Sequence, residues 1–206
     1  MLAFLRTIGW LVVIVYASIP SFWLLIHPRV EYWRTRRRSP YQFLIPVWVT
    51  MWIALALITA PWRRVSLYET GWTWIPAAIL FLLGLWLYKS SGKHFSGAQL
   101  SGAAELLPAR GEQRLAVTGI RTRIRHPVYL GHFCEMLAWS IGTGLAVLYV
   151  LTAFAAATGV IMIRLEDKEL EQRFGEEYRR YRNHVPALIP TLWKPGFSGQ
   201  GLKGDS

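Results

Sequence analysis

The stretch PVYLGHFCEMLAWSIGTGLAVLYVLTAFAAATGVIMI, from Pro127 to Ile163, contains a single charged residue, Glu135. As one helix it would be roughly 55 Å long at 1.5 Å per residue, whereas the hydrocarbon core of a bilayer is about 30 Å thick. The segment SIGTG, residues 140–144, lies near its middle, where small and flexible residues permit a turn. The stretch therefore predicts a tight membrane hairpin of two helices, about Val128–Ile141 and Leu145–Ile163.

Three further runs without Lys, Arg, Asp or Glu precede the hairpin: Thr7–Pro28, Ser39–Trp62 and Thr70–Tyr88. Each suits one crossing, because a membrane helix needs about 20 apolar residues. The predicted fold is therefore all-α, an integral membrane bundle of five helices. A 53% apolar composition and a mean hydropathy of +0.27 exclude a disordered chain. Cys134 is the only cysteine, which excludes a disulfide framework.

The positive charge is distributed unevenly along the predicted bundle. All but three of the 23 Lys and Arg residues fall on one side, the exceptions being Arg6, Arg63 and Arg64. Because cytoplasmic loops collect Lys and Arg, we expect the N-terminus outside and the C-terminus in the cytoplasm, at the plasma (inner) membrane if the source is a prokaryote. The net charge of +11 then reflects topology and contact with anionic lipids, not nucleic acid.

Residues 164–181 continue directly from the last predicted membrane helix. Apolar side chains recur at spacings of four, four and three residues, which predicts one apolar stripe on a cytoplasmic amphipathic helix. The stripe consists of Leu170, Phe174, Tyr178 and Tyr181. Glu166 and Asp167 lie near the membrane exit, where an unpaired carboxylate is costly. We expect Arg125 or a bound ligand to pair with them.

The loop 89–127 is longer than the roughly 12–15 residues beyond which loops are usually functional or disordered. It ends in His126 and Pro127, and proline suits the first turn of a helix. His126 is therefore expected at the helix start, facing the cytoplasmic interface, where backbone N–H groups attract anions. Deeper in the hairpin, His132 and Glu135 either form a structural pair across one turn or line a ligand cavity.

Several standard sites are excluded. The chain has no Gly-rich dinucleotide-binding or P-loop motif. Its histidines show no metal-ligand spacing, so we expect no metal. They are His27, His94, His126, His132 and His184.

Two motifs carry a resemblance to a known family. RHPVYLG, residues 125–131, resembles the RHPxYxG signature of the isoprenylcysteine carboxyl methyltransferase family, which is also similar to phospholipid N-methyltransferases. Residues 166–186 resemble the family pattern EExxLxxxFGxxYxxY followed by VP, with Asp167 in place of the second glutamate. Leu115 and Gly119 resemble the LxxxG stretch that precedes the histidine. The matches span residues 113–190.

The resemblance implies S-adenosylmethionine as the cofactor, bound on the cytoplasmic side between the hairpin and the C-terminal helix. The cofactor contacts that it implies are Leu115, Gly119, His126, Tyr129, Glu166 and Asp167. The chain departs from the family at Arg121, where many members have tyrosine. It departs again at Met162, where the family has an arginine that Arg164 is expected to replace in substrate binding.

The chemistry agrees with general principles. A sulfonium makes methyl transfer intrinsically favourable, so the protein mainly positions the acceptor. His126 is expected to hold the cofactor carboxylate or to act as a base, and Arg125 and Arg164 to hold an acceptor carboxylate or phosphate. We therefore expect methyl transfer to a lipophilic or lipid-attached acceptor with a carboxyl, amine or thiol head, at the cytoplasmic membrane face.

Two other classes of protein remain as alternatives. One is a nicotinamide-dependent membrane reductase, because sterol-reductase membrane domains resemble this C-terminal arrangement. The other is a non-enzymatic scaffold or small transporter. Residues 1–193 are expected to form a single membrane methyltransferase-like domain, and the glycine-rich residues 194–206 a flexible tail.

Overall fold

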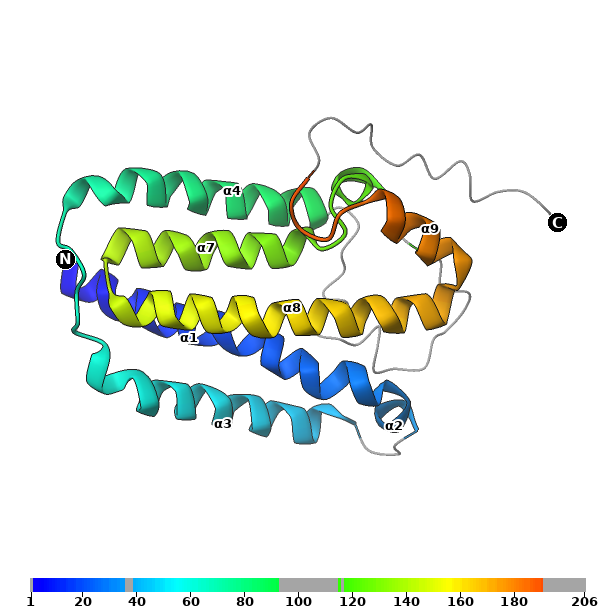
Figure 1. The fold of residues 1–206 in the computed structure, drawn as a ribbon. Helices are drawn as coiled ribbons and strands as arrows, with labels where there is room; N and C mark the ends of the chain where they lie inside the picture. Colours follow the sequence, from blue (N-terminus) through cyan, green and yellow to red (C-terminus); the bar gives the residue numbers. More distant parts are fainter. Residues whose placement is uncertain (1, 36–38, 93–114, 116, 191–206) are drawn as a thin grey trace.

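The computed structural model describes residues 2–35, 39–92, 115 and 117–190, and within these ranges it is helical with no strand (Figure 1). The predicted tail and most of the loop 89–127 lie outside the described residues. The helices are α1 (Leu2–Ile26), α2 (Val30–Arg34), α3 (Tyr41–Thr59), α4 (Trp74–Gly92), α7 (Pro127–Thr143), α8 (Ala146–Phe174) and α9 (Glu176–His184). The predicted all-α bundle is confirmed.

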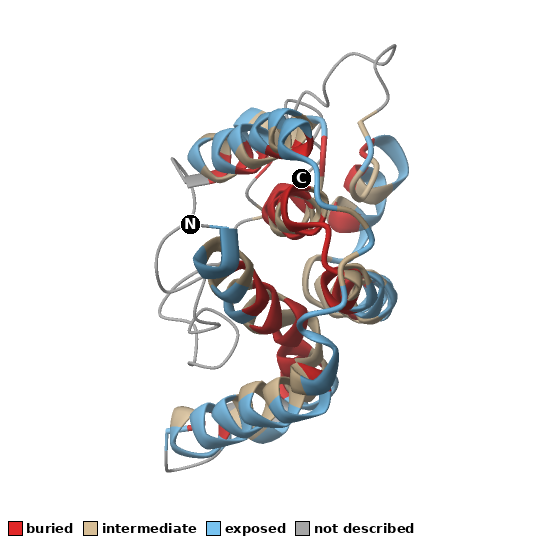
Figure 2. Cartoon of the chain, turned by 90° about the vertical axis from the view of Figure 1, so that its left-hand side faces the viewer, coloured by how far each residue is buried: buried red, intermediate tan, exposed pale blue. Residues whose placement is uncertain are grey.

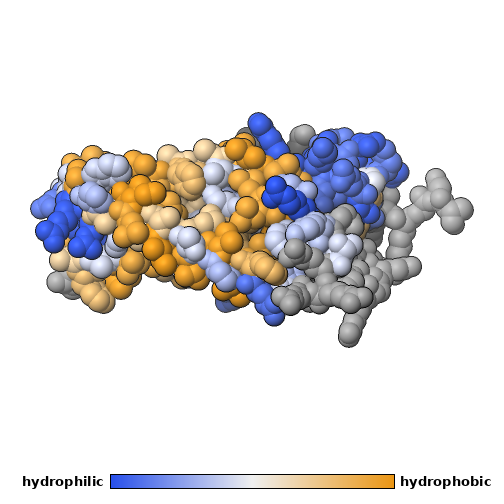
Figure 3. Space-filling model, turned by 90° about the horizontal axis from the view of Figure 1, so that it is seen from below, coloured by the Kyte–Doolittle hydropathy of each residue, from blue (hydrophilic) through white to orange (hydrophobic). Residues whose placement is uncertain are grey.

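Four helical segments among the described residues are long and apolar enough to cross a membrane: Leu2–Arg29, Tyr41–Trp62, Gly71–Ser91 and Ala146–Phe174. Viewed from below, the surface is mainly apolar along the middle of the bundle and hydrophilic at both ends (Figure 3). This distribution suits a bilayer environment. At 17 residues, α7 is shorter than a usual membrane span. The predicted total of five crossings stays a prediction.

The short helix α7 occupies the centre of the bundle. It packs against α4 on one side and against α1 and α8 on the other, while α8 also packs against α1. Figure 2 shows α7 buried around most of its circumference, whereas α3 lies at the edge of the bundle and is largely exposed. An inter-helix hydrogen bond of 2.9 Å, from the Trp10 indole to the Thr59 hydroxyl, ties α3 to α1.

Close approach of two backbones explains the tight packing of α4 on α7. A Cβ atom at Gly84 would lie 2.8 Å from Cγ of Glu135 and 3.1 Å from the carbonyl oxygen of Gly131, so a larger residue does not fit there. Glu135 is buried and accepts a 2.6 Å hydrogen bond from the Tyr16 hydroxyl of α1. Its partner is therefore on another helix and not His132, which lies edge-on to the Tyr16 ring.

The turn between α7 and α8 lies at Gly144 and Leu145, one to two residues from the predicted boundaries. Beyond it, α8 runs without interruption to Phe174. The structure then divides the single amphipathic helix predicted over residues 164–181. Gly175 has φ +57° and ψ −132°, a conformation that favours glycine, and α9 begins directly after it.

The break at Gly175 turns α9 back toward the start of α7 (Figure 1). The residues of the predicted apolar stripe still pack together, but they come from two helices. They also pack against residues that are not part of the stripe. This cluster consists of Leu115, Val117, Leu170, Phe174, Tyr178, Tyr181 and Val185.

Replacing Gly175 with alanine should weaken the docking of α9, because a Cβ is strained at this φ even though no atom lies within 4 Å of it. We expect a loss of about 1–3 kcal/mol of stability, measured by thermal unfolding in detergent. Gly71→Ala is the matched control, because Gly71 also has open space but no positive φ. Equal unfolding temperatures for the two variants would contradict a conformational role for Gly175.

Candidate functional site

Three segments meet at the end of the bundle where α7 begins. The backbone N–H groups of Arg125 and His126 donate to the carbonyl oxygens of Pro186 and Ala187, each at 3.0 Å. The Tyr181 hydroxyl of α9 donates to the carbonyl oxygen of Arg121 at 2.7 Å. These bonds clamp the chain before α7 between α9 and the segment that follows α9.

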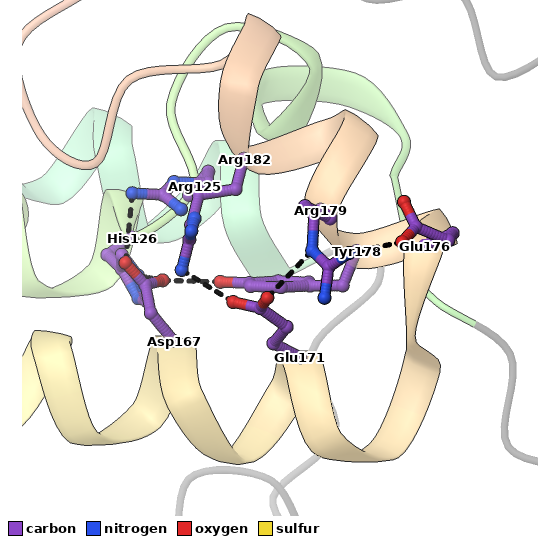
Figure 4. Close-up of polar contacts among 8 residues, drawn as sticks. All are labelled: Arg125, His126, Asp167, Glu171, Glu176, Tyr178, Arg179 and Arg182. Atoms are coloured by element: carbon purple, nitrogen blue, oxygen red, sulfur yellow. Dashed lines mark hydrogen bonds and ion pairs between the residues drawn. The ribbon is translucent and has the colours of Figure 1, made fainter.

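The Asp167 carboxylate lies at the centre of the resulting polar cluster (Figure 4). It is buried, its Oδ2 is 3.0 Å from Nη2 of Arg125, and its Oδ1 is 3.2 Å from Nε2 of His126. The Tyr178 hydroxyl of α9 donates a short hydrogen bond to the same Oδ1. One carboxylate on α8 thus binds the residues before α7 and the helix after Gly175.

His126 is held on several sides. Its Nδ1 is 3.5 Å from Oε2 of Glu166, its Nε2 faces Asp167, and its ring stacks on Tyr129 with a centroid distance of 5.5 Å. Pro127 occupies the first helical turn, so the side chain of His126 lies at the start of α7. The structure therefore brings together Arg125, His126, Tyr129, Glu166 and Asp167.

Two tyrosine hydroxyls act as fixed donors to this region. Burial and then the hydrogen bond to Asp167 raise the pKa of Tyr178 above its ordinary value, and burial raises the pKa of Tyr181 to about 12. Both hydroxyls therefore stay protonated throughout the physiological range. Each donates its proton to an acceptor on a different segment.

Some buried polar atoms of the cluster make no hydrogen bond with the described residues. Nε and Nη1 of Arg125 are buried and make no hydrogen bond with any described residue, and the buried Oε2 of Glu166 has only its 3.5 Å contact with His126. A buried polar atom without a partner costs about 1–3 kcal/mol, so these atoms require an explanation. A polar ligand with both donors and acceptors would satisfy them. Nowhere in the described part of the chain are three His, Cys, Asp or Glu side chains placed to hold a metal ion.

Three of the predicted site residues lie outside the polar cluster. Leu115 packs in the apolar cluster beneath α9, and Gly119 begins the short 3-10 helix Gly119–Thr122. Arg164 is exposed on α8, two residues before Glu166 and thus on another face of the helix. Their proposed roles in binding stay predictions.

Two contacts were not predicted from the sequence. Tyr178 was assigned to an apolar stripe, which describes its ring but not its hydroxyl. The second contact joins His27 and Glu169, with Nδ1 and Oε2 2.7 Å apart. His27, near the end of the run Thr7–Pro28, was only a weak signal for this contact. Its partner Glu169 is 142 residues away in the sequence, so the pairing could not be predicted.

Asp167→Asn should destabilise the protein by about 3–5 kcal/mol, because it leaves the buried Arg125 without its counter-charge. Glu166→Gln, on the adjacent position, should have a small effect on stability, because Oε2 of Glu166 makes no hydrogen bond with a described residue. Thermal unfolding of both variants in detergent checks this difference. Equal losses would show that Asp167 is not the structural centre of the cluster.

No protein-family model matches the chain. Among curated proteins, methanethiol S-methyltransferase 2 of Bradyrhizobium diazoefficiens is 27% identical over 152 residues, which cover 72% of this chain and 51% of that protein. Protein-S-isoprenylcysteine O-methyltransferase of Rattus norvegicus is 27% identical over 159 residues, 70% of this chain and 50% of that protein. Delta(14)-sterol reductase of Mus musculus is 28% identical over 133 residues, which cover 58% of this chain and 32% of that protein.

The chain thus spans about half the length, or less, of these relatives. Two of the three are named methyltransferases, and both alignments cover at least 70% of this chain. The curated relatives support the isoprenylcysteine carboxyl methyltransferase family for this chain, at modest identity.

Proposed function

We propose that this chain transfers a methyl group from S-adenosylmethionine to a lipophilic acceptor. The observation that carries the proposal is the buried cluster of Arg125, His126 and Asp167, with Glu166 beside it, at a hydrophilic end of a bundle with an apolar middle. The methyltransferase relatives support the reaction class.

The polar atoms left over in the cluster fit the cofactor. S-adenosylmethionine has a carboxylate, an ammonium group and ribose hydroxyls, and when bound it supplies a methyl group on a positively charged sulfur. The buried Nε and Nη1 donors of Arg125 suit the carboxylate, and Oε2 of Glu166 suits a hydroxyl or ammonium donor. The residues present therefore match the chemistry of the cofactor.

The roles within the cluster follow from its contacts. Asp167 orients Arg125 and His126, so its role is positioning. Nε2 of His126 is 3.2 Å from Asp167, whereas Nδ1 has only the longer 3.5 Å contact with Glu166, so Nδ1 is the ring nitrogen better placed for a ligand. At that atom His126 either holds the cofactor or takes a proton from an amine or thiol acceptor.

The position of the site suits an acceptor that carries a lipid tail. The tail stays beside the apolar surface while the head group enters the polar end of the bundle. We place this end in the cytoplasm, from the distribution of Lys and Arg. Carboxyl, amine and thiol heads all fit, and the relatives are named for a thiol and for an isoprenylcysteine protein.

A nicotinamide-dependent reductase is the second candidate, because Delta(14)-sterol reductase of Mus musculus aligns with 58% of the chain. The two functions differ in the cofactor that the purified protein binds. Binding of NADPH without binding of S-adenosylmethionine would favour the reductase.

Equilibrium binding of labelled S-adenosylmethionine to the detergent-purified protein tests the proposal. A hydrogen bond to a charged group contributes roughly 1.5–3 kcal/mol, so Glu166→Gln should weaken binding about tenfold or more. Glu69→Gln removes an exposed carboxylate that pairs with Arg6, far from the site, and should bind like wild type. An unchanged dissociation constant for Glu166→Gln would remove Glu166 from the cofactor site.

Turnover with a lipid extract as the acceptor tests His126. His126→Ala should abolish methyl transfer, whereas His126→Asn keeps part of the hydrogen bonding and should retain more activity. If His126 only packs at the start of α7, where its side chain makes no capping hydrogen bond, its loss should lower stability with little change in turnover. Activity near wild type in His126→Ala would therefore assign it a structural role.

A further inference from the structure

A second buried polar contact lies on the α1 side of α8 and joins His27, which is outside both sequence motifs, to Glu169, which occupies an unspecified position of the second motif. His27, in the 3-10 helix His27–Arg29 that follows α1, places Nδ1 2.7 Å from Oε2 of Glu169. The two side chains are only 3% and 15% exposed. Trp23 stacks on the His27 ring with a centroid distance of 5.2 Å. The end of α1 is thereby held against the same stretch of α8 that carries Glu166 and Asp167.

Glu169 lies three residues after Glu166, so the two side chains are neighbours on one face of α8. Each carboxylate has one oxygen directed to a histidine: Oε2 of Glu169 to His27, and Oε2 of Glu166 to His126 at the longer distance of 3.5 Å. Oε1 of Glu169 and Oε2 of Glu166 are both buried and make no hydrogen bond with the described residues. Oε1 of Glu169 thus has no donor among the described residues, and the neighbouring Oε2 of Glu166 has only its long contact with His126.

We propose that Glu169, positioned by His27, forms with Glu166 a subsite that binds a donor-rich polar group of the cofactor. This inference rests on the proposed function. Ionised carboxylates only accept hydrogen bonds, so the subsite selects a group with several donors and repels a carboxylate or phosphate. The ammonium group and the ribose hydroxyls of the cofactor both have this chemistry.

The polarity of the neighbouring groups supports this assignment. On the other side of Glu166, Arg125 has unbonded donors that suit an acceptor group, so the two ends of the region have opposite chemistry. The cofactor has both kinds of group, because its carboxylate only accepts hydrogen bonds while its ammonium group and ribose hydroxyls donate them. A role limited to holding α1 against α8 would leave unexplained why the second oxygen of Glu169 is buried without a hydrogen bond to a described residue.

Equilibrium binding of two cofactor analogues to the full chain in detergent tests the subsite. Both analogues contain adenine and ribose, but only S-adenosylhomocysteine also has the amino-acid part; 5′-methylthioadenosine lacks it. Glu169→Gln keeps the size of the side chain and can still pair with His27, but it places an amide donor where Oε1 stood. We expect S-adenosylhomocysteine to bind about tenfold more weakly to this variant, with an unfolding temperature near that of wild type.

Glu171→Gln is the matched control, because it removes a carboxylate from the same helix that pairs with Arg179 and Arg182 instead. It should bind both analogues like wild type. Weakening of both analogues by Glu169→Gln assigns the subsite to the ribose, and weakening of S-adenosylhomocysteine alone assigns it to the ammonium group.

Unchanged affinities of both analogues for Glu169→Gln would overturn the subsite while leaving the proposed function intact. Failure of the wild type to bind either analogue would overturn the proposed function itself. If Glu169→Gln does not fold, His27→Leu decides the question, because it removes the ring nitrogen that contacts Glu169 and leaves the carboxylate present but no longer positioned. That variant should also weaken S-adenosylhomocysteine binding, and wild-type affinity would count against the subsite.

Discussion

A carboxylate buried at the end of an apolar bundle is stable only when other groups compensate its charge, and Asp167 draws its partners from two other parts of the chain. Arg125 and His126 come from the residues before α7, and Tyr178 comes from α9. The backbone of α8 therefore determines where α7 begins and where α9 must return. The two sequence motifs are far apart in the chain, but they meet at this one carboxylate.

The helices themselves could be predicted from the sequence, because apolar runs between charged segments have few other stable arrangements in a membrane. The break at Gly175 could not. The apolar residues continue across it with helical spacing, so Phe174 and Tyr178 give the same pattern whether one helix or two carry them. Only the positive φ of Gly175 separates the two cases, and a glycine by itself does not reveal its backbone angles.

The candidate site was predicted in part for a similar reason. The sequence places Glu166 and Asp167 at the right level of the bundle, but adjacent helical residues point about 100° apart. Which of the two faces the interior depends on the packing of α9, and the structure assigns that place to Asp167. Glu166 is left with an unbonded oxygen and is thus better suited to a ligand. Arg164, only two residues earlier, faces away for the same geometric reason.

The bond from Tyr16 to Glu135 has a consequence for how the chain enters a membrane. Helix α7 is short and carries a carboxylate at its centre, so on its own it is poorly suited to lipid. The Tyr16 hydroxyl that binds Glu135 belongs to a residue that is synthesised 119 residues earlier, and Gly84 on α4 provides room for the Glu135 side chain. The earlier helices must already be in place to receive it. The placement of α7 therefore depends on its contacts with α1 and α4 as well as on its own hydrophobicity.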